Sequence, residues 1–316
     1  MPAPTRRAAL GLLVAGTVSG CGIRLEDDAP RVPLVPTRDP ISGEAALVGL
    51  LAGTTTLAAA VAGGDQADYA EGLAAQAATL DSALRERGVP QSVTSPTPTT
   101  SGTGVGTGAP SGGDAATPGS GNSSGAPGDV GAMGLASAVA ARDLLEVADL
   151  DLRPMLAALS AQRVTLARAA GVTRGLPRAA AADLPEQVAL GHLAATREAV
   201  YGVEVAAARA AETVRERAVA TLAELRGSVL VQEDHLGAAV PPTPTAYVLP
   251  LEVTDNGTAT RLIRYLTSGL VDAMAATLPT LAEYPPALLT ATDRLTDACL
   301  LGRRWGVVPG AFPGMS

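Results

Sequence analysis

Apolar side chains recur every three or four positions through residues 183–308, the spacing that places them on one face of an α-helix. Four helix-start signals divide this segment: the capping boxes Asp183–Glu186 and Thr213–Glu216, the cap Asp255 or Asn256, and the pair Pro285-Pro286. They predict four helices of about 20–27 residues with one long connection, 240–256, between the second and the third. Helix pairs joined by one crossover are typical of a four-helix bundle.

The same spacing appears earlier in the chain, in 41–88 and in 132–174, and each segment predicts two helices. Gly63-Gly64 divides the first pair, and Ser42 can cap its first helix. Neither segment has the alternating, β-branched pattern of a strand. The predicted fold class is therefore all-α.

Residues 89–131 differ in kind from the helical segments on either side. Of these 43 residues, 31 are Gly, Ser, Thr or Pro, and none is Leu, Ile, Met or aromatic. Such a composition cannot bury enough apolar area to offset the entropy lost on ordering. We predict a disordered insert that interrupts an N-terminal helical-hairpin region; it is either a plain spacer or a substrate for O-glycosylation.

The first residues have the pattern of a bacterial lipoprotein signal. Arg6-Arg7 precedes a short apolar run, 8–18, which is followed by Ser19-Gly20-Cys21. We expect cleavage before Cys21, lipidation of its thiol and attachment to the outer face of the cell membrane. The alternative is an ordinary secretory peptide with a chance cysteine. The arginine pair also resembles a twin-arginine signal, so the export route stays open.

No further segment approaches the roughly 20 consecutive apolar residues of a membrane helix, so we expect lipid alone to supply the anchor. The predicted organisation is, in chain order, a signal peptide over 1–20, an extended tether over 21–40, a helical region over 41–175 with its insert at 89–131, and a four-helix bundle over 183–314.

The charge balance argues against one class of partner. All 23 basic residues are arginine, against 31 acidic residues, and removal of 1–20 leaves 21 against 31. An acidic protein repels phosphate backbones, so we expect no nucleic acid partner. If Cys21 is lipidated, Cys299 has no disulfide partner, and its apolar neighbours predict a buried, unreactive thiol.

Four short motifs in the C-terminal part resemble a known family. In chain order they are Glu198–Gly202, Pro241–Pro250, Arg304-Trp305 and Ala311–Gly314. Over about 185–314 the chain resembles the ferritin-like domain of unknown function found in actinobacterial envelope lipoproteins. The resemblance implies a ferritin-like four-helix bundle and supplies no activity. The chain departs from the family at Leu225–Ser228, where a His-x-x-Arg-Asp-like run is usual, and at Tyr265–Gly269, where a glutamate is usual.

A di-iron carboxylate centre needs inward glutamates on two helices and a Glu-x-x-His motif on each of the other two. Neither His192 nor His235 has a glutamate three residues before it. Projected at about 100° per residue, both histidines lie away from the apolar stripes, and we expect both in solvent. We predict no metal or other cofactor; in the alternative, Glu198, Glu204 and Glu233 are weak ligands for iron or manganese.

The predicted inward faces of the helices carry few carboxylates. The first helix is centred on Leu190, Leu193, Ala194 and Ala208; the third presents Leu262, Tyr265, Leu266, Gly269 and Ala273; the fourth presents Leu288, Thr292, Leu295 and Cys299. Neither of the last two faces contributes an acid.

Charged side chains in the stripes of the first two helices predict a buried polar network instead. Arg197, Tyr201 and Glu204 follow one face of the first helix, and Arg226 and Glu233 repeat that spacing on the second. Cross-helix Arg–Glu pairs would satisfy buried charge and fix the helix register, with a small net gain in stability. A polar pocket for a small ligand is the functional alternative.

The chain has no Cys-x-x-Cys motif and no phosphate-binding loop of the P-loop type. We predict no catalytic residue and expect a non-enzymatic, lipid-anchored helical module that binds a ligand or an envelope protein. Two alternatives stay open: a ferritin-like metal-binding protein or oxidoreductase, and a carrier of an apolar ligand between the two helical regions. The oligomeric state is open as well.

Overall fold

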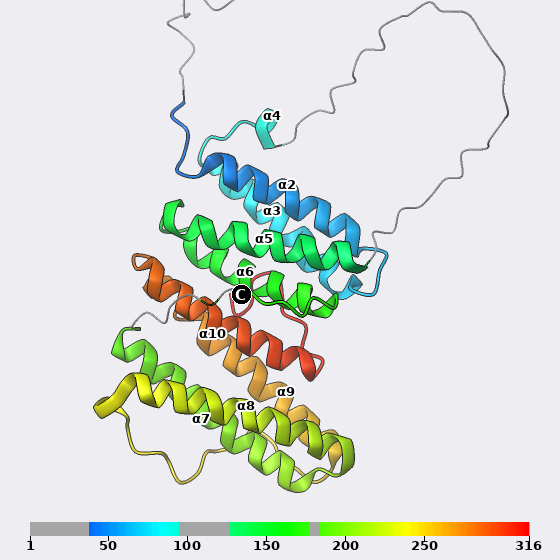
Figure 1. Ribbon diagram of the computed structural model, residues 1–316, viewed down its shortest axis with the longest axis vertical. Coiled ribbons are helices and arrows are strands. Elements are labelled where there is room, and N and C mark those ends of the chain that lie inside the picture. Colours follow the sequence, from blue (N-terminus) through cyan, green and yellow to red (C-terminus); the bar gives the residue numbers. More distant parts are fainter. Residues whose placement is uncertain (1–37, 95–126, 177, 179–183, 316) are drawn as a thin grey trace, which may run out of the picture. The chain divides into compact units, whose positions relative to one another are not determined.

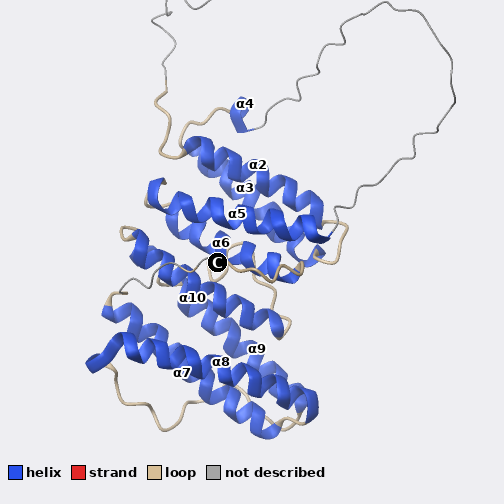
Figure 2. Ribbon diagram, in the orientation of Figure 1, coloured by secondary structure: helices blue, strands red, loops and turns tan. Residues whose placement is uncertain are grey.

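A computed structural model describes residues 38–94, 127–176, 178 and 184–315, which form helices and loops with no strand among them (Figure 2). The all-α class predicted from the sequence is confirmed for these residues. The predicted signal peptide, Cys21 and most of the tether lie outside the described residues, as does the central part of the insert.

The first helices are α2 (Glu44–Val61), the 3-10 turn η2 (Ala67–Tyr69), α3 (Ala70–Glu86) and α4 (Gln91–Thr94). Ser42 is not the cap of α2. Gly43 has the N-cap position with a left-handed φ of 72°, which glycine adopts without steric cost. The Glu44 carboxylate accepts a hydrogen bond from the Ile41 N–H at 3.1 Å, so a carboxylate rather than a serine hydroxyl secures this helix start.

The next two helices are α5 (Pro127–Val147) and α6 (Arg153–Ala169). Both ends of the predicted insert belong to the packed fold, because α4 and the first turn of α5 are helical and Val89 and Val130 are each 3% exposed. Each end of the insert has only one such buried valine, and a single apolar residue gives no periodic signal. The boundaries predicted from the composition of 89–131 are therefore too wide.

The C-terminal helices are α7 (Glu186–Arg209), α8 (Glu212–Leu236), α9 (Asn256–Ala275) and α10 (Pro285–Arg304), of 24, 25, 20 and 20 residues. The four predicted helices and their long connection are confirmed. Asp255 caps α9: its carboxylate accepts from the Thr258 N–H at 2.7 Å, and the Thr258 hydroxyl accepts from the Asp255 N–H. The predicted capping box at Thr213 is wrong, because the N-cap of α8 is Ala211, two residues earlier.

The helices pack in a continuous series, in the order α3, α2, α5, α6, α10, α9, α7 and α8 (Figure 1). One hydrophobic core includes buried side chains from both predicted helical regions. The described residues from Pro40 onward form one compact unit. The two regions therefore share a core, because α6 packs against α10 instead of facing solvent.

α6 is enclosed on all sides, and every residue from Leu156 to Ala167 is buried. Arg163 is part of this run, and its Nη2 donates to the Thr54 hydroxyl of α2 at 3.0 Å. Burial lowers the pKa of Arg163 to about 9, so the side chain stays charged at neutral pH. Among the described residues no carboxylate pairs with it, and nothing in the alanine-rich sequence of α6 marks this burial in advance.

The inward face predicted for α7 is rotated from the observed one. Ala194 and Ala208 are exposed, whereas His192 is completely buried. α7 packs against both α8 and α9, so its buried surface is wider than one stripe. Gly202 permits the close approach to α9, because a Cβ there would lie 2.3 Å from the Leu266 side chain.

The predicted inward face of α10 is confirmed, since Leu288, Thr292, Leu295 and Cys299 are all buried. That of α9 is half right. Leu262 and Leu266 are buried, but Tyr265 is 56% exposed and Gly269 is exposed as well.

α2 corrects the expectation that no other segment could cross a membrane. By length and composition alone it is long and apolar enough to do so. In the fold, Leu47, Leu50 and Leu57 are buried on the side of α2 that packs with α3 and α5. Its apolar character is therefore used, at least on this side, for the core of the protein.

Candidate functional site

A cleft of about 430 Å³ lies between α8 and α10. α8 packs on α7, α7 on α9 and α9 on α10, but the backbones of α8 and α10 have little direct contact. The apolar part of the lining includes Leu225 and Val231 of α8, Leu270 and Met274 of α9, and Leu301 of α10. The volume lies in the range of about 300–1,000 Å³ that is typical of ligand-binding clefts.

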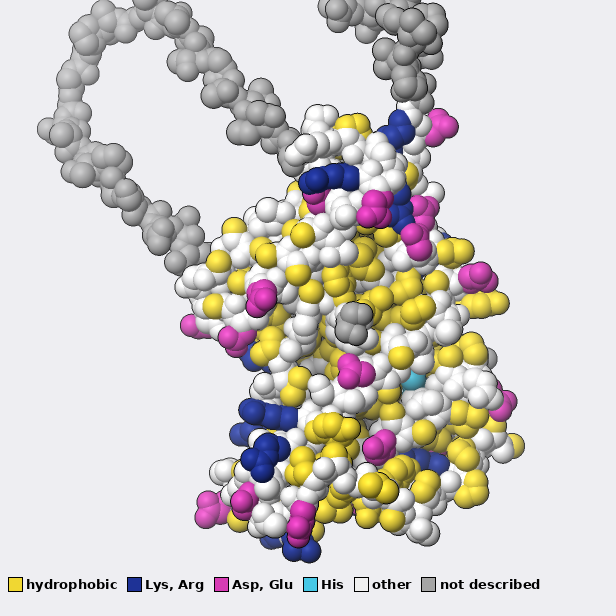
Figure 3. Space-filling view, turned by 180° about the vertical axis from the view of Figure 1, so that it is seen from behind, with side chains coloured by type: hydrophobic (Ala, Val, Ile, Leu, Met, Phe, Trp, Pro, Cys, Tyr) yellow, Lys and Arg dark blue, Asp and Glu magenta, His cyan; other side chains and the backbone are white. Residues whose placement is uncertain are grey.

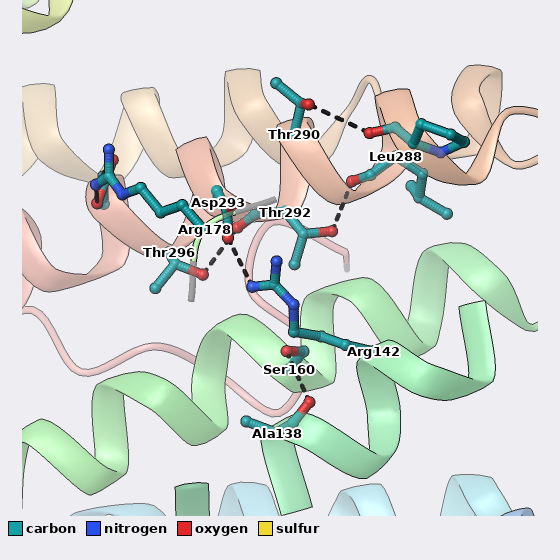
Figure 4. Close-up of polar contacts among 11 residues, drawn as sticks. Ala138, Arg142, Ser160, Arg178, Leu288, Thr290, Thr292, Asp293 and Thr296 are labelled. Carbon is teal, nitrogen blue, oxygen red and sulfur yellow. Dashed lines mark hydrogen bonds and ion pairs between the residues drawn. The ribbon is translucent and has the colours of Figure 1, made fainter. Parts of the chain in front are cut away.

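Asp293, a carboxylate of this cleft, is paired with an arginine from another part of the fold. Arg142 points from α5 toward α10, and its Nη1 donates to the Asp293 Oδ1 at 2.6 Å (Figure 4). The two side chains are 12% and 17% exposed, so this is a mostly buried ion pair. The N-terminal helices therefore take part in setting the charge of the cleft.

Two further carboxylates of the cleft are paired at its surface. Asp297, one turn beyond Asp293 on α10, accepts hydrogen bonds from Arg178 at 2.6 and 2.7 Å. Burial raises the pKa of Asp297, and the Arg178 charge opposes that effect. Glu224 of α8 pairs with Arg304 at the end of α10, and both are about half exposed. Such pairs add little stability, but they neutralise the carboxylates that line the cleft.

His192 and Arg294 meet beside the cleft. The Thr277 hydroxyl donates to the Met274 carbonyl at 2.8 Å, so its oxygen is left to accept from the His192 Nε2–H, at 3.0 Å. The other ring nitrogen, Nδ1, is then unprotonated and accepts from the Arg294 Nη1–H at 3.3 Å. The partners thus assign one tautomer of His192, and the ring holds the guanidinium of Arg294 at the cleft.

The expectation that His192 lies in solvent is wrong. Burial lowers the pKa of His192 to about 3, and the charge of Arg294 adds to the effect. A neutral imidazole with both nitrogens engaged is not poised to act as a general base. His235 is only half-buried, and its Nε2 accepts from the Leu184 N–H at 3.3 Å.

Arg197 and Glu233, two members of the predicted polar network, form an ion pair between α7 and α8. The Arg197 Nη2 donates to Glu233 at 2.6 Å, and its Nη1 donates to the Pro241 carbonyl at 2.9 Å. Arg197 is 7% exposed. Tyr201 contacts Tyr247 with 5.6 Å between ring centroids. Through these contacts with Pro241 and Tyr247, Arg197 and Tyr201 hold the long connection against α7. This connection contains one of the family-like motifs.

Arg226 and Glu204 also pair across α7 and α8, at 2.7 Å, but this pair is not buried. The side chains are 60% and 41% exposed, which contradicts the prediction that both belong to a buried network. Glu204 lies on the outer side of a helix whose inward face was misplaced. An exposed pair of this kind contributes little to stability.

The residues present do not fit a di-iron centre. Glu198 is exposed, and Glu204 and Glu233 are each paired with an arginine. Within the described ranges, no group of three or more His, Cys, Asp or Glu side chains is placed to share a metal ion. Carboxylates neutralised by guanidinium groups are poor cation ligands, so we derive no metal chemistry from this arrangement.

The predicted burial of Cys299 is confirmed, with 1% exposure. Burial raises the pKa of its thiol to about 12, so it remains protonated and unreactive at neutral pH.

Sequence reasoning missed the charged residues that define the cleft. Asp293, Arg294 and Asp297 lie within a helix whose other positions are largely apolar, and that contrast was the available signal. The pattern gives no indication that α5 and the segment before α7 supply their partners, because those contacts join positions more than 100 residues apart.

Residues 187–316 match a family described as a domain of unknown function, DUF4439. The match confirms the coarser part of the resemblance, a domain of unknown function over the C-terminal region, and it spans less than half of the chain. No curated protein and no solved structure matches the chain.

Proposed function

We propose that this protein is a lipid-anchored envelope protein whose helical body binds a small ligand in the cleft between α8 and α10, without catalysing a reaction. The observation that carries the proposal is the cleft itself, with an apolar lining and three carboxylates that are each neutralised by an arginine. Such a lining favours burial of an apolar ligand body.

Binding is favoured over catalysis by the state of the groups that could react. His192 is neutral with both nitrogens engaged, and the Cys299 thiol is buried and protonated. The surface on one side of the molecule argues against a flat protein interface there, and this favours a small ligand as the binding partner. There, the hydrophobic side chains lie in small groups between charged and polar ones (Figure 3).

We also propose that α7–α10 form the ferritin-like four-helix bundle that the family resemblance implies. Two helix pairs, α7 with α8 and α9 with α10, are joined by the long connection 237–255. We interpret them as a four-helix bundle that is open along the α8–α10 side. The apolar-ligand alternative is placed in this cleft and not between the two helical regions, where α6 and α10 pack directly.

Filling the cleft should abolish binding. Gly227 lines the cleft, and a Cβ there would meet no atom within 4 Å, so the helix leaves room for a side chain to begin at this position and Gly227→Phe adds a ring at the cleft. We expect the neutral fluorophore N-phenyl-1-naphthylamine to bind the wild type and to lose its fluorescence enhancement with Gly227→Phe. Gly191→Phe is the matched control, because Gly191 is an equally open helical glycine away from the cleft. Equal enhancement in all three proteins would contradict the proposal.

The lipid anchor has an independent test. Cys21→Ser removes the thiol that would take the diacylglyceryl group, so we expect the protein to move from the membrane to the soluble fraction. The measurement is fractionation of cells that express each form, with Cys299→Ser as the control. If the Cys21→Ser protein stayed in the membrane fraction, the anchor would be of another kind.

A further inference from the structure

Among the described residues, Arg294 has no carboxylate partner, unlike the arginines that pair with the carboxylates of the cleft. Arg142, Arg178 and Arg304 each pair with an acid. The hydrogen bond of Arg294 to His192 is its one polar contact within the part of the chain that the structure describes. A half-buried guanidinium without a counter-ion is unusual, because such a charge is ordinarily paired.

The partner that Arg294 does have cannot neutralise it. The Nδ1 of His192 accepts one N–H at 3.3 Å, and the ring is uncharged. A guanidinium has five N–H donors, so most of those on Arg294 remain available. The chain from the Met274 carbonyl through Thr277 and His192 therefore orients a positive charge at the cleft without cancelling it.

We propose that Arg294 binds the carboxylate of an amphiphilic monoanion, of the fatty-acid type, whose apolar chain lies along Leu225, Leu270, Met274 and Leu301. This assignment rests on the proposed function of the cleft and adds the chemical class of its ligand. The planar guanidinium matches the two oxygens of a carboxylate in a bidentate pair. The apolar side chains line the same cleft as Arg294, so head and chain fit one site.

The charge around Arg294 favours a monoanion over a phosphate ester. Asp293, Asp297 and Glu224 line the same cleft, and although each is paired, a dianion would meet their combined repulsion with only one uncommitted arginine to offset it. An inorganic anion would leave the apolar lining uncovered.

The test compares three ligands that share one chain: decanoate, decanol and decyl phosphate. Cys21→Ser removes the expected lipid-attachment site, so the whole chain is studied without detergent, which would compete for the cleft. Binding is measured by calorimetry at pH 7. We expect decanoate to bind about tenfold more tightly than decanol, and decyl phosphate to bind more weakly than decanoate. Arg294→Gln should weaken decanoate about tenfold and leave decanol unchanged.

Two further variants keep the result interpretable. Arg294→Lys retains the positive charge, so we expect it to bind decanoate more tightly than Arg294→Gln does. If Arg294→Gln lost affinity only because substitution at this position disrupts the fold, Arg294→Lys would show no such recovery. Arg226→Gln removes an exposed arginine that pairs with Glu204 away from the cleft, and we expect decanoate affinity to stay within about twofold.

The outcomes separate the two proposals. If decanoate and decanol bind equally, or if Arg294→Gln leaves decanoate unchanged, the role of Arg294 is overturned while the ligand-binding cleft stands. Equal or tighter binding of decyl phosphate overturns the choice of a carboxylate. If none of the three ligands binds, the binding function of the cleft fails and the role of Arg294 fails with it.

Discussion

Lowering the pH from 7 to 4 is expected to destabilise the wild-type protein by about 2–3 kcal/mol more than it destabilises His192→Gln. His192 is completely buried, and its pKa is lowered from 6.5 to about 3. Between these values the unfolded chain binds a proton that the folded protein does not. Stability from this residue is therefore fully present above pH 6.5 and is lost as the pH falls.

The measurement is urea unfolding of both proteins at several pH values, because the difference between them isolates His192. Asp297, whose pKa is raised by burial, changes stability in the opposite sense with pH, but it is present in both proteins and cancels. His235→Gln is the control for removing a histidine whose ring is only half-buried. Parallel pH profiles for wild type and His192→Gln would show that the ring is not buried in neutral form.

Trp305→Ala is expected to destabilise the protein by about 3–5 kcal/mol, the usual loss when a large buried aromatic is truncated. Trp305 is 1% exposed, and its Nε1–H donates to the Thr221 hydroxyl of α8 at 3.0 Å. Arg217 of α8 lies over the ring at 5.1 Å from its centroid. These contacts join the end of α10 to α8, so the substitution removes packing where the two helices have few other contacts.

Trp305→Phe separates volume from hydrogen bonding. Phenylalanine keeps most of the buried area and loses the bond to Thr221, so we expect a smaller loss of about 1–2 kcal/mol. Circular dichroism during urea unfolding is the suitable signal, because both substitutions remove the single tryptophan of the chain. A Trp305→Ala protein within 1 kcal/mol of wild type would contradict the packing described here.

The sequence predicted the helices well and their faces unevenly, and the physical reason is visible in particular helices. α10 has leucines and a cysteine on one side and charged residues on the other, so its inward face was predicted correctly. α7 is rich in alanine and packs on two sides, so its apolar pattern had little direction and His192 was assigned to the wrong side. Among the helix-start signals, the cap at Asp255 was predicted correctly, whereas those at Ser42 and Thr213 were not.

The cleft could not be predicted, because its residues come together only through tertiary packing. Arg142 reaches Asp293 from a helix about 150 positions earlier, and no local pattern predicts that pairing. The cross-helix pairing of Arg197 with Glu233 did follow from sequence spacing, since both lie on neighbouring helices of one hairpin. Local chemistry was thus accessible from the sequence, whereas contacts across the fold were not.

The packing of α6 against α10 means that the boundary of sequence similarity is not the boundary of cooperative folding. The family match begins at residue 187, yet α10, inside the match, packs on α6, which lies before it. A fragment cut at 187 would expose the side of α10 that α6 covers and would lose Arg142, the partner of Asp293. The domain that recurs among relatives and the unit that unfolds as a whole are, in this chain, two different stretches of sequence.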